Sequence, residues 1–210
     1  MQNSHLLANE NAFENILDHA RIHSFLTTLQ PITPARSQTV LSASLIVTPV
    51  GEMIALADKQ ALYFLDFTDH PKLHRRIRKL QLATKSTIVP GETAPLQSVA
   101  RELHSYFFNI LPDFKTPLLL IGSPFQKKTW EALLTIPYGT TVSYKGLAYS
   151  LAKPTASRAV ANANGANNIA LIIPCHRVIA SNGDLGGYGS GVARKQKLLT
   201  HEQTTHNQGM

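Results

Sequence analysis

The sequence contains a single cysteine, Cys175, among its 210 residues. One cysteine cannot form an intramolecular disulfide, and no basic stretch followed by a long apolar segment lies near the N-terminus, so we expect a cytoplasmic protein. No apolar run approaches the roughly 20 residues that a membrane helix needs, and we expect no membrane partner.

Acidic residues are scarce, at 13 against 20 Lys and Arg, which gives a formal net charge of +7. That balance favours an anionic partner such as nucleic acid, although it would equally suit general solubility.

Metal-ligand patterns are also missing. The sole cysteine cannot build a cysteine zinc site, and the histidines in the first half of the chain lack a convincing ligand spacing. These histidines are His5, His19, His23, His70, His74 and His104. We therefore expect neither a bound metal nor a cofactor.

Shifts in composition divide the chain into four segments. We expect an N-terminal extension and linker (residues 1–38), an N-terminal α/β subdomain (39–121), a mainly helical C-terminal domain (122–202) and a short tail (203–210). In the second segment three short β-prone runs, SLIVTPV, MIALAD and ALYFLDF, predict a small antiparallel sheet. Helices are expected over residues 70–82 and 95–110, with a loop between them.

The third segment is predicted to be mainly helical. After a helix over residues 125–136, Ser143 is placed to cap a helix over 144–151, and Pro154 to begin one that Gly165 ends. Two short helices joined by a tight turn are a helix-turn-helix candidate. The apolar run that ends at Pro174 predicts a strand carrying the cysteine. The predicted fold class is therefore α+β. A small N-terminal antiparallel sheet with helices is followed by a mainly helical C-terminal domain, which contains the helix-turn-helix and the PCHRV strand.

The surroundings of Cys175 indicate a reactive thiol. A free cysteine is most often a small buried hydrophobe. Here Pro174 ends the strand, His176 supplies a base and Arg177 adds positive charge, which together favour an activated thiolate. Glu202 is a candidate third group that orients the imidazole, or else a solvated surface carboxylate.

Four blocks of sequence carry a resemblance to a known family. They are SPFQKKTWEALLTIPYGTTVSYKGLA (123–148), KPTASRAVANANGANN (153–168), PCHRV (174–178) and GYGSGVARKQKLL (187–199). In order and spacing they resemble the methylated-DNA protein-cysteine methyltransferases, which repair guanine alkylated at O6. The resemblance covers residues 122 to 202, and the preceding sheet is similar to that family's variable N-terminal subdomain.

The resemblance implies DNA repair by base flipping, because an O6 substituent inside a stacked duplex cannot meet a buried thiolate otherwise. Cys175 would take the alkyl group irreversibly as a thioether, so each protein would act once. The implied partner is double-stranded DNA containing alkylated guanine, held through its minor groove by a monomer. O4-alkylthymine is a further candidate substrate.

The resemblance also implies roles for individual residues around the thiol. His176, through a water, and Glu202 would remove the proton of Cys175. Tyr144 would donate a proton toward N3 of the departing guanine; alone, it could equally be a packed aromatic at a helix start. Asn167 would tie the recognition helix to the cysteine strand through side-chain hydrogen bonds.

The base pocket departs from the family pattern in two places. The carbonyls of Cys175 and Val178 would accept from the exocyclic amine of guanine, and Tyr188 would form a wall. Gly189 replaces a serine often found there, although its backbone donor to O6 remains. Residues 167–170 read Asn-Asn-Ile-Ala instead of Asn-Pro-x-Pro, so the range of lesion sizes stays open.

DNA contacts are implied along the second helix of the helix-turn-helix. Arg158 would stack in place of the flipped nucleotide, although an arginine in a basic protein is usually a solvated charge. Its small neighbours Ala156 and Ser157 would let the helix approach the narrow minor groove. Residues implied to contact the DNA backbone without sequence choice are Lys145, Lys153 and Ser181.

Two other functions are compatible with the residues. A Cys-His hydrolase would also place a thiol beside a base, but it should turn over and needs an oxyanion hole that the sequence does not reveal. A DNA-binding module could recognise alkylated guanine or regulate transcription without chemistry. The presence of Cys175 argues against the second function.

Overall fold

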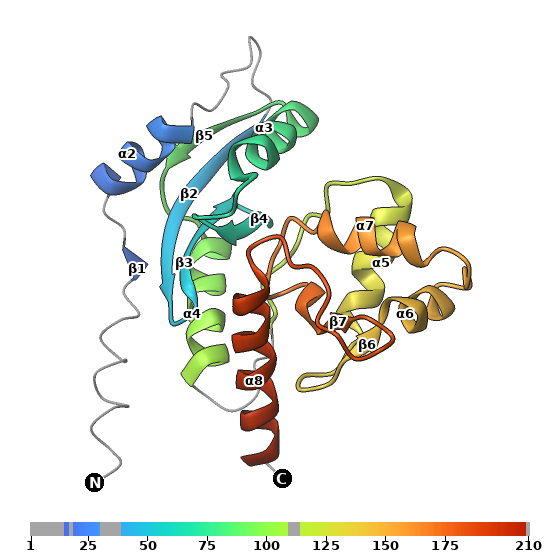
Figure 1. The fold of residues 1–210 in the computed structure, drawn as a ribbon. Coiled ribbons are helices and arrows are strands. Elements are labelled where there is room, and N and C mark those ends of the chain that lie inside the picture. The colour runs from blue at the N-terminus through green and yellow to red at the C-terminus, as the bar shows by residue number, and fades with distance from the viewer. Residues whose placement is uncertain (1–14, 17–18, 30–38, 109–113, 209–210) are drawn as a thin grey trace, which may run out of the picture. The chain divides into compact units, whose positions relative to one another are not determined.

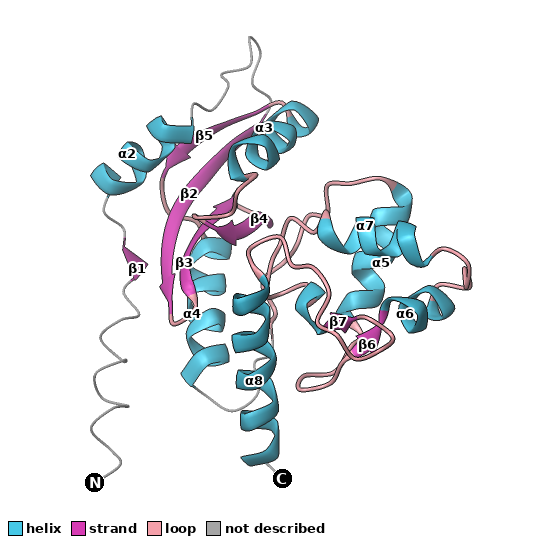
Figure 2. Cartoon of the chain, in the orientation of Figure 1, coloured by secondary structure: helices cyan, strands magenta, loops and turns pink. Residues whose placement is uncertain are grey.

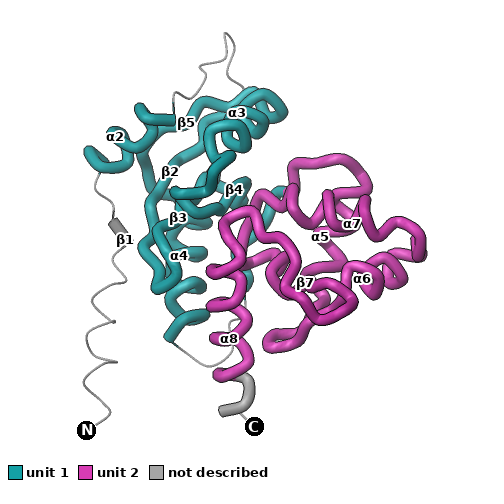
Figure 3. Tube along the Cα trace, viewed as in Figure 1, with its two compact units in different colours: residues 1–119 teal, residues 120–210 magenta. Residues whose placement is uncertain are grey.

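The computed structural model describes residues 15–16, 19–29, 39–108 and 114–208. The chain divides into two compact units, Met1–Leu119 and Leu120–Met210 (Figure 3). The α+β fold class is confirmed, because the first unit holds a small sheet with helices and the second is mainly helical (Figures 1 and 2). Most of the predicted extension over residues 1–38 lies outside the described residues, as does the end of the predicted tail. The division into four segments stays a prediction.

Five strands form the sheet of the first unit. They are β1 (Asn15–Ile16), β2 (Thr39–Thr48), β3 (Gly51–Ala57), β4 (Leu62–Phe67) and β5 (Ser86–Pro90). The order β1-β2-β3-β4 is antiparallel throughout, as the three β-prone runs predicted for β2 to β4. β5 was expected to be loop, and that expectation is wrong. It pairs in parallel with β2, from Thr39 opposite Ser86 to Ala43 opposite Pro90, so the sheet is mixed.

Three helices complete the core of the first unit, α2 (His19–Leu29), α3 (Leu73–Thr84) and α4 (Ala94–Phe108). All six residues of β4 are buried, including Asp66, which pairs with Arg76 of α3. α4 packs on β2 and β3, and α2 and α3 pack on β5. α3 confirms the helix predicted over residues 70–82, and α4 confirms the one predicted from apolar residues spaced three and four apart over 95–110.

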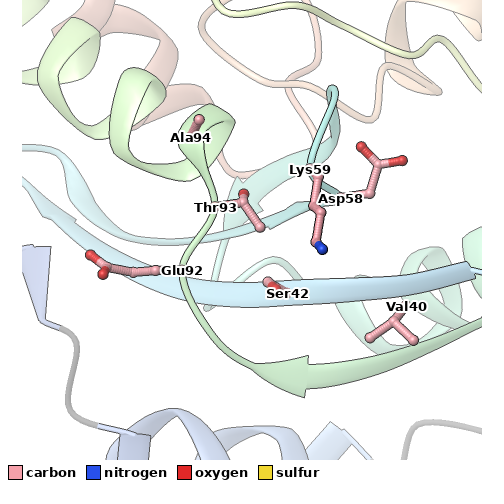
Figure 4. Close-up of a pocket in the computed structure, with 7 residues that line it drawn as sticks. All are labelled: Val40, Ser42, Asp58, Lys59, Glu92, Thr93 and Ala94. Atoms are coloured by element: carbon pink, nitrogen blue, oxygen red, sulfur yellow. The ribbon is translucent and has the colours of Figure 1, made fainter.

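An open pocket lies beside β2 and the start of α4 (Figure 4). Its charged residues are Asp58, Lys59 and Glu92. The Asp58 carboxylate already accepts bonds from the backbone N–H groups of Gln60 (2.7 Å) and Ala61 (2.8 Å) and from a tyrosine hydroxyl. Its hydrogen-bonding capacity is therefore largely used within its own turn.

The second unit contains four α-helices and two very short strands. They are α5 (Pro124–Leu134), β6 (Val142–Ser143), α6 (Tyr144–Ser150), α7 (Ser157–Gly165), β7 (Val178–Ile179) and α8 (Val192–Gln208). The predicted cap is confirmed, because the Ser143 hydroxyl accepts from the N–H of Gly146 at 2.9 Å. α6 and α7 are the two predicted short helices, although α7 begins at Ser157 rather than at Pro154.

The apolar run before the cysteine is not a strand. Residues 170–172 form a buried turn, and Cys175 begins a one-turn 3-10 helix, η1 (Cys175–Arg177), so the predicted active-site strand is wrong at this point. Leu171 takes a left-handed conformation with φ of 70°. Pro174 has no N–H to offer a neighbouring strand, which favours the turn. Strand pairing starts only at Val178, in parallel with Val142.

No helix in the described ranges is both long and apolar enough to cross a bilayer.

Candidate active site

The thiol of Cys175 sits at the first residue of η1. The residue is 7% exposed, so it is buried but not completely sealed. The side-chain amide of Asn167 donates to its Sγ at 3.2 Å. The same amide donates to the carbonyl of Ile173 at 2.9 Å, while the Asn167 Oδ1 accepts from the N–H of Ile169. The side chain of Asn167 therefore forms hydrogen bonds with backbone groups that, in an extended strand, would pair with a neighbouring strand.

A second asparagine, which the sequence did not single out, joins α7 to the cysteine. The Asn164 amide donates to the Cys175 carbonyl at 3.2 Å. The N–H of Val178 donates to the same carbonyl. A carbonyl oxygen has two lone pairs, so that of Cys175 is fully used. It is a poorer acceptor for a guanine amine than the sequence implied.

His176, Arg177 and Glu202 form a buried charged cluster. The Glu202 carboxylate lies 2.7 Å from His176 Nε2 and accepts from the Arg177 guanidinium at 2.8 and 3.0 Å. It also accepts from the N–H of Gly139 at 3.1 Å, while a further Arg177 nitrogen donates to the Ile136 carbonyl at 2.6 Å. Glu202 and His176 are completely buried, so these contacts replace water for every charge in the cluster.

The electrostatics of this cluster leave His176 neutral and Glu202 ionised. Burial lowers the pKa of His176, although its bond to Glu202 opposes that change. Burial alone would raise the pKa of Glu202, but the hydrogen bonds and charges of His176 and Arg177 outweigh it and lower the pKa to about 2. A carboxylate only accepts hydrogen bonds, so the His176 proton must lie on Nε2. Nδ1 then carries a lone pair, and within the described residues it has no hydrogen-bond partner.

Lys195 is a site residue that the sequence analysis missed. It is completely buried in α8, and its ammonium donates to the carbonyl of Val178 at 2.5 Å and to that of Leu185. Burial lowers the pKa of Lys195, whereas the negative charge of Cys175 raises it. The ammonium therefore stabilises a thiolate at Cys175. The sequence signal was available, because Lys195 and Glu202 lie seven residues apart on the helix face that also buries Leu198 and Leu199.

Tyr144 lies at the start of α6 and is half-buried. Burial raises its pKa, and the negative charge of Cys175 raises it further, so its hydroxyl stays protonated and can donate. Its ring packs against the backbone of Gly186, where an added Cβ would lie 3.4 Å from Tyr144 Cε2. The loop from Gly186 to Gly191 holds Tyr188, which is half-buried, and Gly189, which is exposed.

The predicted DNA-contacting residues lie on the surface of the second unit. Arg158 is exposed in the first turn of α7, beside the half-buried Ala156 and Ser157. The remaining three, Lys145, Lys153 and Ser181, are exposed in α6, in the turn after it and in the loop after β7. Within the described part of the chain Arg158 makes no ion pair.

Comparisons with known proteins relate this chain to one family. Residues 124–204 match the family model described as 6-O-methylguanine DNA methyltransferase, DNA binding domain. The chain is 40% identical over 163 residues to the methylated-DNA–protein-cysteine methyltransferase of Methanosarcina barkeri, covering 76% of this chain and 95% of that protein. A Mycobacterium bovis protein of the same name is 50% identical over 103 residues, or 49% of this chain and 62% of that protein.

Solved structures show the same likeness. The crystal structure of Mycobacterium tuberculosis OGT in complex with DNA aligns with a TM-score of 0.67 at 36% sequence identity, over 80% of this chain and 94% of that one. The alignments to the Methanosarcina barkeri protein and to this structure are longer than either unit, so they extend over both, and the family model covers the turn that holds the cysteine. The chain belongs to the family of methylated-DNA–protein-cysteine methyltransferases.

Proposed function

We propose that this protein repairs DNA by transferring the alkyl group from O6 of guanine to Sγ of Cys175. The observation that carries the proposal is the hydrogen-bonded pair at the residue that follows Cys175 in η1, where the Glu202 carboxylate holds a neutral His176 whose Nδ1 has no hydrogen-bond partner among the described residues. This arrangement fits a base that accepts the thiol proton through a water. The buried Lys195 ammonium then stabilises the thiolate.

The thiolate attacks the alkyl carbon in line. An S–C bond forms, the C–O6 bond breaks, and its electron pair leaves with the guanine. Tyr144 can neutralise the departing base at N3, because its pKa is raised by burial and it keeps its proton. The thioether has no hydrolytic route back to the thiol, so each molecule reacts once.

Recognition of the base uses fewer acceptors than the family pattern implies. The Val178 carbonyl receives a bond from the Lys195 ammonium, and a carbonyl oxygen has a second lone pair that can accept from the exocyclic amine of guanine. The Cys175 carbonyl already receives two. Val178 is therefore the principal acceptor, beside a wall formed by Tyr188 and the backbone N–H of Gly189.

The duplex is held through its minor groove by α7. Arg158 takes the position of the flipped nucleotide, and small side chains at Ala156 and Ser157 let the backbone come close. Lys145, Lys153 and Ser181 add phosphate contacts. All of these residues come from one unit of one chain, which supports action as a monomer.

The experiment mixes the protein with a duplex carrying labelled O6-methylguanine and locates the methyl group by peptide mass. We expect one methyl per protein on the peptide containing Cys175, and none on Cys175→Ser. Label on any other residue, or repeated turnover, contradicts the mechanism. Incubation with an ester substrate tests the hydrolase alternative, for which turnover is the expected result.

A further inference from the structure

A row of positive side chains follows one face of α3, in the unit that does not contain the thiol. We call it the basic stripe and define it by four exposed residues, which are Lys72, Arg75, Arg78 and Lys79. At 3.6 residues per turn these positions fall within about a third of the helix circumference. The stripe therefore presents its cations together to one side.

The charge of the first unit is concentrated around this helix. Residues 70–91 contain six Lys and Arg and no acidic residue, whereas the rest of residues 1–119 contains five Lys and Arg and ten Asp and Glu. A general need for solubility does not explain such segregation, because dispersed charge would serve equally well. Concentrated positive charge creates a local potential that attracts a polyanion.

The cations of the stripe differ from the neighbouring Arg76, which has an acidic partner among the described residues. Their helix neighbour Arg76 pairs with Asp66, with Nε 2.9 Å from Oδ2. Within the described part of the chain, no residue of the basic stripe makes an ion pair. The stripe therefore keeps its charge available for an external partner.

The other face of α3 indicates what kind of partner fits. Leu73, Ile77 and Leu80 are at most 2% exposed, because they pack inside the unit. A helix that lies in a membrane surface has to bury its apolar face among lipids, and this face is already occupied. Leu82 is the one large apolar side chain of α3 that is exposed, at 64%. The phosphate backbone of a nucleic acid can bind the exposed cations alone and does not require the apolar face of α3.

We propose that the basic stripe binds the sugar-phosphate backbone of duplex DNA without sequence preference, as a contact additional to α7. The inference rests on the proposed function, which brings the protein to DNA. From Lys72 to Lys79 the stripe is about 10 Å long, a length over which one DNA strand presents about three phosphates. Four cations spread over that length match this spacing. Such contacts hold the protein on undamaged DNA between lesions.

The test compares two double variants that lose the same charge. Arg75→Ala/Lys79→Ala removes one Arg and one Lys from the stripe, and Lys59→Ala/Arg101→Ala removes one of each from exposed positions elsewhere in the first unit. Alanine preserves the helix. The affinity of each protein for an undamaged duplex is measured as a function of salt concentration. For the stripe variant we expect a slope of log K against log salt that is shallower by about 1.8, since each phosphate contact contributes about 0.9. We expect the control to keep the slope of the wild type.

An unchanged slope in the stripe variant, or an equal loss in the control, overturns the inference. Binding to vesicles of anionic lipid that the stripe variant loses, with the DNA slope unchanged, also overturns it. Transfer of the alkyl group from a free O6-alkylguanine base to Cys175 should be equal in all three proteins. Absence of that transfer in the wild type contradicts the proposed function instead, so the two failures are distinguishable.

Discussion

Replacing Glu202 with Gln tests the buried charged cluster most directly. The substitution keeps the shape of the side chain but removes the negative charge that Arg177 and His176 share. Breaking one partner out of a buried ion pair costs about 3–5 kcal/mol, because the other charge stays buried and uncompensated. We therefore expect Glu202→Gln to lower the free energy of unfolding by that amount at pH 7.

The pH dependence gives a second, independent magnitude. The pKa of Glu202 falls from 4.5 to about 2 on folding, which corresponds to about 3 kcal/mol of stability. A carboxyl group with a lowered pKa contributes this stability above its unfolded pKa and loses it as the pH falls toward its folded pKa. The difference in stability between wild type and Glu202→Gln should therefore be full above pH 4.5 and shrink by about 3 kcal/mol as the pH falls to about 2.

Urea unfolding followed by tryptophan fluorescence measures both quantities. Trp130 is the sole tryptophan, and it is 1% exposed in the second unit, so its signal reports the unit that holds Glu202. Glu131→Gln is the matched control, because Glu131 is exposed in α5. It should change the free energy of unfolding by less than about 0.5 kcal/mol. A loss below about 1 kcal/mol in Glu202→Gln, or a loss that does not vary with pH, would refute the reasoning.

Three further substitutions test the proposed site. Arg158→Ala should slow repair in duplex DNA at least about tenfold but leave reaction with the free alkylated base unchanged, because the free base needs no extrusion; equal losses on both substrates contradict that role. Lys195→Met should move the pH profile of Cys175 alkylation to higher pH, since the ammonium no longer stabilises the thiolate; an unchanged profile in rate measurements contradicts the electrostatic role. Asn167→Ala should destabilise the second unit by about 1–3 kcal/mol in urea, because buried carbonyls lose their donor. Stability within about 0.5 kcal/mol of the wild type would show that the turn does not depend on that amide.

Local signals predicted the helices of the second unit well. The cap at Ser143 and the glycine at 165 are short-range features, and both mark the ends of observed helices. β5 was missed because its pairing with β2 joins residues more than forty apart in the sequence. Thr87, Ile88 and Val89 favour a strand, but the run is short and the following Pro90-Gly91 pair is typical of a loop.

The turn before Cys175 could not be predicted from periodicity. A run of buried apolar residues fits a strand, a helix or a set of turns, and the choice depends on where its backbone groups find partners. Here an asparagine side chain supplies them, at 2.9 Å to Ile173 and 3.3 Å to Ile169. Lys195 was missed because a lysine is normally solvated, although its helical spacing from the buried leucines of α8 placed it on the inner face of that helix.

α8 has a consequence for the order in which the protein becomes reactive during synthesis. Both the Lys195 ammonium and the Glu202 carboxylate reach the cysteine turn from this helix, although the turn itself is made some twenty residues earlier in the chain. In a chain whose α8 has not yet folded, the Cys175 thiol is present, but the Lys195 and Glu202 charges do not yet lie at the cysteine turn. On the proposed mechanism, the thiol would therefore gain its alkyl-accepting capacity only after α8 has packed against the cysteine turn.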